Sequence, residues 1–127
     1  LAKFSPTAQS YMAPLPLQVD STLSSYREIA LSMDGHQGDN MVASQALKDA
    51  TMADRILRYS QAGHVFLHIN GAYHSKAREG IISYLTAHIP AEKILTIHTA
   101  VTSAAQLEDV DFNLDDYTFI VLQMEEK

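Results

Sequence analysis

The hydrophobic and polar positions divide the chain into an irregular start and a series of helical and extended segments. Residues 1–20 contain three prolines and no sustained period, so we expect an irregular arm. The apolar spacing predicts a short helix over 21–33, and the polar stretch 35–40 with its two glycines predicts a loop. A longer helix is predicted over 41–59, and the Asp-Asn pair that ends the loop provides its N-cap.

The second half of the chain alternates between extended and helical patterns. Residues 64–69 predict a strand, 75–88 a helix, and 93–97 and 116–122 two further strands. A strand, a helix and a strand of these lengths form a βαβ crossover, which implies a parallel sheet covered by helices. We therefore expect an α/β fold in which residues 21–127 form one domain, or the C-terminal half of a larger α/β fold that another segment or a partner completes.

Composition and charge exclude several classes of protein. The 127 residues carry a net charge of -6, and the nine Lys and Arg residues are scattered, so no basic patch for nucleic acid is expected. The absence of cysteine excludes disulfides and thiolate metal sites. No stretch approaches the roughly 20 apolar residues that span a bilayer, so we expect this chain to be soluble.

Polar residues follow two of the predicted strands. Asn70, Gly71, Tyr73 and His74 come after the first strand, and His98 and Thr99 after the second. Because ligands of parallel sheets bind beyond the carboxyl ends of the strands, these residues are expected to meet at one edge. The helix predicted to begin at Ser75 would add free N–H groups that favour an anion.

The same residues also fit a purely structural interpretation. Gly71 can supply a positive φ angle, Asn70 can bond its own backbone, and Tyr73 can pack on the sheet edge. His64 and His68 lie about 13 Å apart along the predicted strand, too far to share one metal ion, and are better explained as sheet residues. Sequence signatures of zinc proteases, serine hydrolases and nucleotide-binding loops are absent.

Two motifs together resemble a known family. The helix motif SQALKDATMA at 44–53 and the turn NGAYH at 70–74, followed by Gly80 and Ile81, are similar to the ChaN-like family of haem-binding, iron-regulated lipoproteins. The resemblance spans residues 23–122 and corresponds to the C-terminal half of the family's fold. Members begin with a strand that ends in a GExH-like motif, which these residues lack. The family is related in fold to erythromycin esterases and to the Tiki/TraB group.

The resemblance implies a ligand and a set of site residues. Haem would be held in a pocket at a dimer interface, with tyrosine as an iron ligand and histidine or lysine as propionate contacts. Tyr73 and His74 are the matching candidates for the iron. The other implied cofactor-binding residues are Asn70 and Gly71 in the same turn, and Lys48 and Met52 on the motif helix, although Met52 also suits core packing.

Three functions follow as hypotheses. The first is haem binding in iron or haem uptake at the bacterial cell envelope, by a membrane-anchored lipoprotein that is a homodimer or is completed by a further N-terminal segment. The alternative is a hydrolase or metal-dependent enzyme related to the erythromycin esterase and Tiki group, with His74 as base or ligand. The third is a binding module for another small anionic ligand. Binding is the expected role in preference to turnover.

Overall fold

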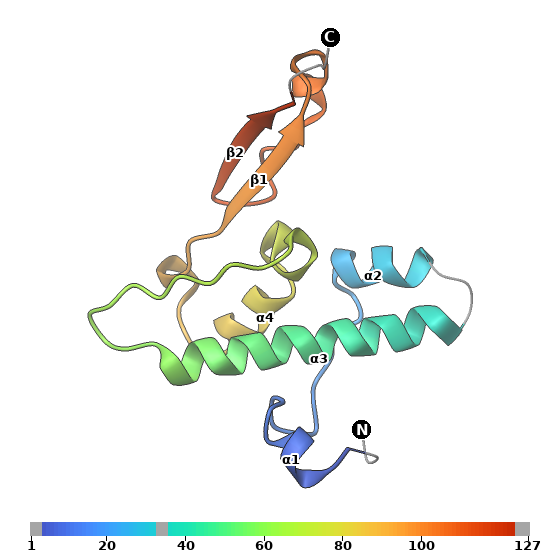
Figure 1. Cartoon of the computed structure of the whole chain (residues 1–127), viewed down its shortest axis with the longest axis vertical. Helices are drawn as coiled ribbons and strands as arrows, with labels where there is room; N and C mark the ends of the chain where they lie inside the picture. Colours follow the sequence, from blue (N-terminus) through green and yellow to red (C-terminus); the bar gives the residue numbers. More distant parts are fainter. Residues whose placement is uncertain (1–3, 33–35, 124–127) are drawn as a thin grey trace.

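One long helix carries the remaining elements of the fold (Figure 1). The computed structural model describes residues 4–32 and 36–123, and its helices are α1 (Pro6–Gln9), α2 (Ser24–Leu31), α3 (His36–Tyr59) and α4 (Ile81–Thr86). The strands are β1 (Ile97–Thr102) and β2 (Tyr117–Leu122), and short 3-10 helices occur at η1 (Ala72–His74), η2 (Lys76–Arg78), η3 (Ala91–Lys93) and η4 (Ala104–Asp109). Both α2 and α4 pack on α3, and the strand pair projects beyond them.

The strands confirm the predicted α/β class. They pair in parallel, with Ile97 opposite Tyr117 and Thr102 opposite Leu122. Their connection runs through η4, because parallel strands cannot be joined by a tight hairpin. No helix among the described residues has the length and hydrophobicity needed to cross a membrane.

Small residues let α3 pack closely on its neighbours. Its buried side chains include Ala46, Asp49, Ala50 and Ala53, which follow the three- and four-residue spacing of one helix face. Ala53, on this face, packs with Ile81, Ile82 and Leu85 of α4 in the core cluster. The core therefore lies between α3 and α4, and a single carboxylate interrupts its small-residue stripe.

The loop predicted at 35–40 is wrong over its described part, because α3 already begins at His36. Asp39 therefore lies in the first turn of the helix and does not cap it. Gly38 accounts for the difference: a β-carbon at this position would lie 2.6 Å from the carbonyl oxygen of Ala30. Close contact between α2 and α3 thus extends the helix through a stretch whose composition favours a loop.

The strand predicted at 64–69 does not form. These residues make an extended, exposed connection between α3 and η1, drawn in green to yellow in Figure 1. None of the N–H groups of 65–69 donates a backbone hydrogen bond to another described residue. An alternating pattern makes a strand only when a neighbouring strand pairs with it, and here β1 pairs with β2 instead. The predicted crossover from this segment is therefore absent.

The helix predicted at 75–88 is also shorter than expected. Ala77 and Arg78 both have φ of +58°, and Gly80 has φ of +56°, so the backbone turns sharply before α4 starts at Ile81. Ser75 consequently lies between two 3-10 turns and does not cap the helix. Gly80 precedes the helix, where its missing β-carbon permits close contact with the rest of the turn.

The strand predicted at 93–97 is displaced by several residues, because β1 spans Ile97–Thr102. His98 and Thr99 therefore lie inside β1 and do not follow a strand end. Asp116 explains the boundary: its carboxylate accepts hydrogen bonds from the backbone N–H of Thr96 at 2.7 Å and from the Thr96 hydroxyl at 2.9 Å. This contact aligns the two chains immediately before β1 and β2.

A carboxylate from a distant turn caps α2. Glu79 accepts hydrogen bonds from the backbone N–H groups of Ser24 at 2.9 Å and Ser25 at 2.7 Å. Burial raises the pKa of Glu79, but the bonds from Ser25 and Ser24 outweigh it, so its pKa lies below the ordinary 4.5. The turn that leads into Gly80 is thereby fastened to the start of α2.

We expect Gly38→Ala to lower the free energy of unfolding by about 1–2 kcal/mol. Alanine gains about 1 kcal/mol over glycine within a helix, but overpacking typically costs about 1–3 kcal/mol and here involves backbone. Gly71→Ala is the control, since Gly71 has φ of -68° and its nearest neighbour is 4.0 Å away. Urea denaturation of both variants measures the difference, and equal midpoints would contradict the close packing at Ala30.

We expect Glu79→Gln to lower the stability at neutral pH by about 0.5–2 kcal/mol, the usual range for a helix cap. Because the folded-state pKa is lowered, the carboxylate stabilises the protein above the unfolded pKa near 4.5, and this contribution is lost as the pH falls through the folded pKa. Unfolding curves from neutral to acidic pH should therefore converge for wild type and variant. A constant difference at every pH would contradict the role of the charge.

Candidate functional site

The connection from Asn70 to Ser75 is closed by its own side chains. The amide of Asn70 donates to the carbonyl oxygen of Gly71 and to the hydroxyl of Ser75, both at 2.9 Å. The backbone N–H of His74 donates to the carbonyl of Gly71 at 2.9 Å and closes η1. Asn70 thus shapes the turn that carries Tyr73 and His74, as the structural interpretation expects. The positive φ angle expected of Gly71 is wrong, because its φ is -68°.

His74 is paired with a buried carboxylate. Its Nδ1 atom lies 2.5 Å from Oδ1 of Asp49, whose side chain is 0% exposed in the middle of α3. The other oxygen of Asp49 accepts a hydrogen bond from the Tyr26 hydroxyl at 2.8 Å. The turn, α2 and α3 therefore meet at one carboxylate.

Burial shifts the pKa values of two members of this cluster, Asp49 and Tyr26. Burial raises the pKa of Asp49, and the hydrogen bonds from His74 and Tyr26 offset only part of that effect. Burial and the bond to Asp49 both raise the pKa of Tyr26, which stays a neutral donor. The Tyr26 hydroxyl therefore serves as a fixed hydrogen-bond donor to the carboxylate.

Gly80 makes room for the pair. A β-carbon on Gly80 would lie 2.4 Å from the backbone oxygen of His74 and 3.1 Å from Oδ2 of Asp49. Its φ of +56° combined with ψ of -116° is also unfavourable for residues that carry a β-carbon. Gly80 is therefore the position at which the backbone passes closest to His74 and Asp49 in this turn.

The remaining predicted site residues lie at the surface or in the core. Tyr73 is 56% exposed, and the ammonium of Lys76 lies 6.0 Å from the centre of its ring. Lys48 is exposed on α3, whereas Met52 packs against the core cluster. The structure therefore brings Tyr73 and His74 together on one turn and leaves Met52 facing the core.

Three residues of the cluster were missing from the predicted site: Asp49, Tyr26 and Gln45. The Gln45 amide nitrogen lies 2.8 Å from Nδ1 of His74 and 3.4 Å from the carbonyl oxygen of Tyr73. One sequence signal could have found Asp49, since it shares a helix face with Ala46, Ala50 and Ala53. A carboxylate within a stripe of small residues is expected to have a buried partner.

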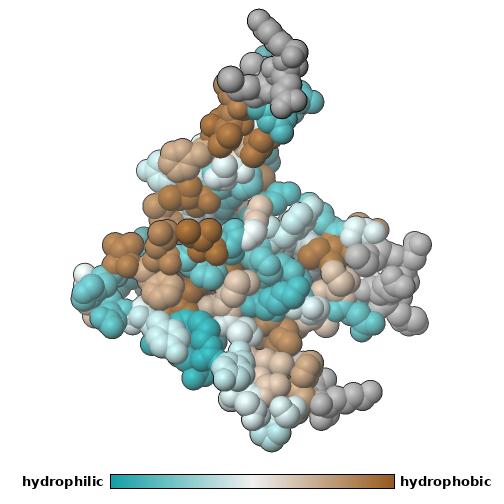
Figure 2. Space-filling model, viewed as in Figure 1, coloured by the Kyte–Doolittle hydropathy of each residue, from teal (hydrophilic) through white to brown (hydrophobic). Residues whose placement is uncertain are grey.

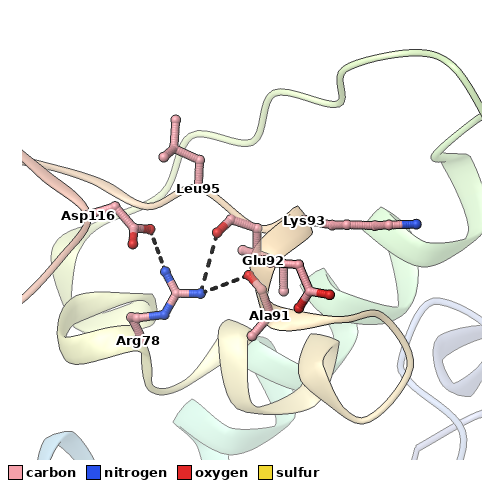
Figure 3. A pocket seen from close by; sticks show the side chains of 7 residues that line it. Arg78, Ala91, Glu92, Lys93, Leu95 and Asp116 are labelled. Atoms are coloured by element: carbon pink, nitrogen blue, oxygen red, sulfur yellow. Dashed lines mark hydrogen bonds and ion pairs between the residues drawn. The ribbon is translucent and has the colours of Figure 1, made fainter.

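A second polar cluster, shown in Figure 3, holds the strands against the turn. The Arg78 guanidinium pairs with Asp116 and donates to the carbonyl oxygens of Ala91 at 3.2 Å and Ile94 at 3.4 Å. Bonds from Thr96 and the charge of Arg78 lower the pKa of Asp116. These partners satisfy the guanidinium of Arg78, which lines the adjoining hollow of about 430 Å³ together with Glu92 and Lys93.

A larger hollow of about 650 Å³ lies between the N-terminal arm, α3 and α4. It is lined by residues such as Leu17, Leu57 and Tyr84, and neither hollow includes Tyr73 or His74.

His64 and His68 were predicted to be sheet residues, and this prediction is wrong, because both lie on the exposed connection. Within the described part of the chain, no group of three or more His, Asp or Glu side chains is arranged to hold a metal ion.

The fold and this cluster define a small α/β protein in which a buried carboxylate supports a partly exposed histidine beside an exposed tyrosine. The family model for haem-binding uptake proteins of the Tiki superfamily, ChaN, matches residues 1–85. The chain belongs to this family. The match includes all members of the Asp49 cluster and ends before the strands begin. No curated protein and no solved structure matches the chain.

Proposed function

We propose that this chain binds haem at the 70–76 turn, with Tyr73 and His74 as the candidate iron ligands. The observation that carries the proposal is the Asp49–His74 pair. A buried acceptor holds one ring nitrogen of His74 at 2.5 Å, while 22% of that side chain remains exposed beside Tyr73. Membership of a haem-binding family supports haem as the ligand in preference to another small anion.

The donor set of the turn fits haem. Tyrosine oxygen and histidine nitrogen both serve as axial ligands of haem iron in proteins. Lys76 lies close to the Tyr73 ring and supplies a cation of the kind that pairs with a propionate. When bound, haem would supply an iron centre and two carboxylates, whereas the residues of this chain would fix its position.

We further propose a role in iron or haem uptake at the bacterial cell envelope, carried out by an anchored, iron-regulated lipoprotein. The family description supports uptake as the process. Binding and delivery need an accessible ligand site and no catalytic group, which suits the exposed position of Tyr73.

A second protein surface is proposed to complete the fold. Val65 is 98% exposed, and one face of the strand pair presents Ile97, Val101, Tyr117, Phe119 and Val121 to solvent. Figure 2 shows hydrophobic side chains gathered over the strands. Parallel sheets are normally covered on both faces, so a second subunit or a further segment is expected to pack here.

The Asp49–His74 pair also supports an enzymatic alternative. A buried carboxylate that orients histidine is the arrangement that prepares a general base in hydrolases. In this alternative His74 would activate water or hold a divalent metal. Activity that requires His74 and a divalent metal, without any haemin-induced Soret band, would favour the enzyme over the binding protein.

The test of haem binding is a titration of the chain with haemin, followed by its Soret absorbance. We expect saturable binding that weakens at least about tenfold in Tyr73→Phe and in His74→Ala, because each variant removes a candidate ligand (about 1.4 kcal/mol). Tyr73→Phe should leave the free energy of unfolding almost unchanged. His74→Ala removes a partner of the buried Asp49 and should cost about 1–3 kcal/mol, so it is titrated where it is fully folded.

The matched controls are Tyr11→Phe and His68→Ala, which change exposed residues outside the turn. Both should bind haemin as the wild type does. If Tyr73→Phe and His74→Ala also bind normally, and only stability changes, the turn has a structural role and the proposal is wrong.

A further inference from the structure

The carboxylate of Asp49 is held from two sides. Tyr26 donates to Oδ2 at 2.8 Å, and His74 contacts Oδ1 at 2.5 Å. Asp49 and Tyr26 are both buried, and Gly80 passes close to the same oxygen that Tyr26 binds. Asp49 therefore cannot rotate away from His74 without losing its other hydrogen bond.

Two side chains compete for Nδ1 of His74. When Asp49 is ionised, its carboxylate oxygen can only accept a hydrogen bond from the ring. The Gln45 amide nitrogen, 2.8 Å from Nδ1, can only donate one. A neutral imidazole carries one proton, so the stronger neighbour decides which nitrogen holds it. Hydrogen bonds to an ionised group are roughly twice as strong as neutral ones, which favours the proton on Nδ1.

The other ring nitrogen is free within the part of the chain described here. The hydrogen bonds of the His74 ring to described residues are made by Nδ1, and the side chain retains solvent exposure. With the proton on Nδ1, Nε2 carries a lone pair and can accept a proton or bind a metal.

We propose that Asp49 is the positioning residue of this site: it fixes the Nδ1–H form of His74 and presents the unprotonated Nε2 as the ligand-binding atom. Asp49 acts through His74 and does not itself touch the ligand. The preference of the tautomer stands on the ligand-free geometry, and only the identity of haem as the ligand rests on the proposed function.

The first test measures the tautomer without any ligand. Long-range proton–nitrogen correlation spectra of the ¹⁵N-labelled chain at neutral pH should show His74 in the Nδ1–H form. Asp49→Asn presents an amide that can donate to Nδ1, so the ring should switch to the Nε2–H form. If the wild-type spectrum shows the Nε2–H form, the proposal is wrong. This outcome can be observed even if the variant does not fold.

Tyr26→Phe is the matched control. It removes the other hydrogen bond of the same buried carboxylate and should lower stability, yet His74 should keep its Nδ1–H form. If Tyr26→Phe switches the tautomer as Asp49→Asn does, general loosening of the cluster explains both results, and the specific role of Asp49 is wrong.

Haemin titration of the same variants then tests the consequence. Asp49→Asn should bind haemin about 10–100-fold more weakly, the usual effect of removing the partner of a histidine ligand, whereas Tyr26→Phe should change the affinity much less. Equal affinities despite a switched tautomer would overturn the role of Asp49 in binding. If the tautomer depends on Asp49 but the wild-type chain binds no haemin, the positioning role of Asp49 is supported and haem binding is wrong.

Discussion

A single buried carboxylate determines how the helical part of this protein is assembled. An ionised or polar side chain inside a protein is stable only when its hydrogen-bonding capacity is satisfied. Asp49 meets this requirement through Tyr26 from α2 and His74 from the η1 turn, segments that are far apart in sequence. Removing one partner of such a group typically costs about 1–3 kcal/mol, so the three segments depend on one another.

The turn before α4 is built around this constraint. Gly80 takes a conformation that other residues avoid and thereby allows the backbone to pass the His74–Asp49 pair. The residue before it, Glu79, reaches to the start of α2 and caps that helix. The same short turn therefore positions the candidate ligand residues and joins α2 to the rest of the helical layer.

The strands are attached in a different way. Arg78 and Asp116 connect the turn to the start of β2, but one face of the sheet has no cover among the described residues. The family match covers the helical layer with its turn and stops before β1. The candidate site thus belongs to the part of the chain that is shared with the haem-binding family, and the uncovered strands lie outside the matched residues.

Local patterns in the sequence determined the α/β class, most of α3 and the position of β2, because apolar periodicity and the residues that end helices act over short distances. The NGAYH turn was also visible, since glycine and asparagine restrict the backbone locally. The 64–69 segment was not predictable in this way, because a strand needs a partner that the sequence does not name. Only the tertiary structure placed Asp49 between Tyr26 and His74. These two residues are 23 and 25 positions away from Asp49 in the sequence, so their hydrogen bonds depend on how the whole chain packs.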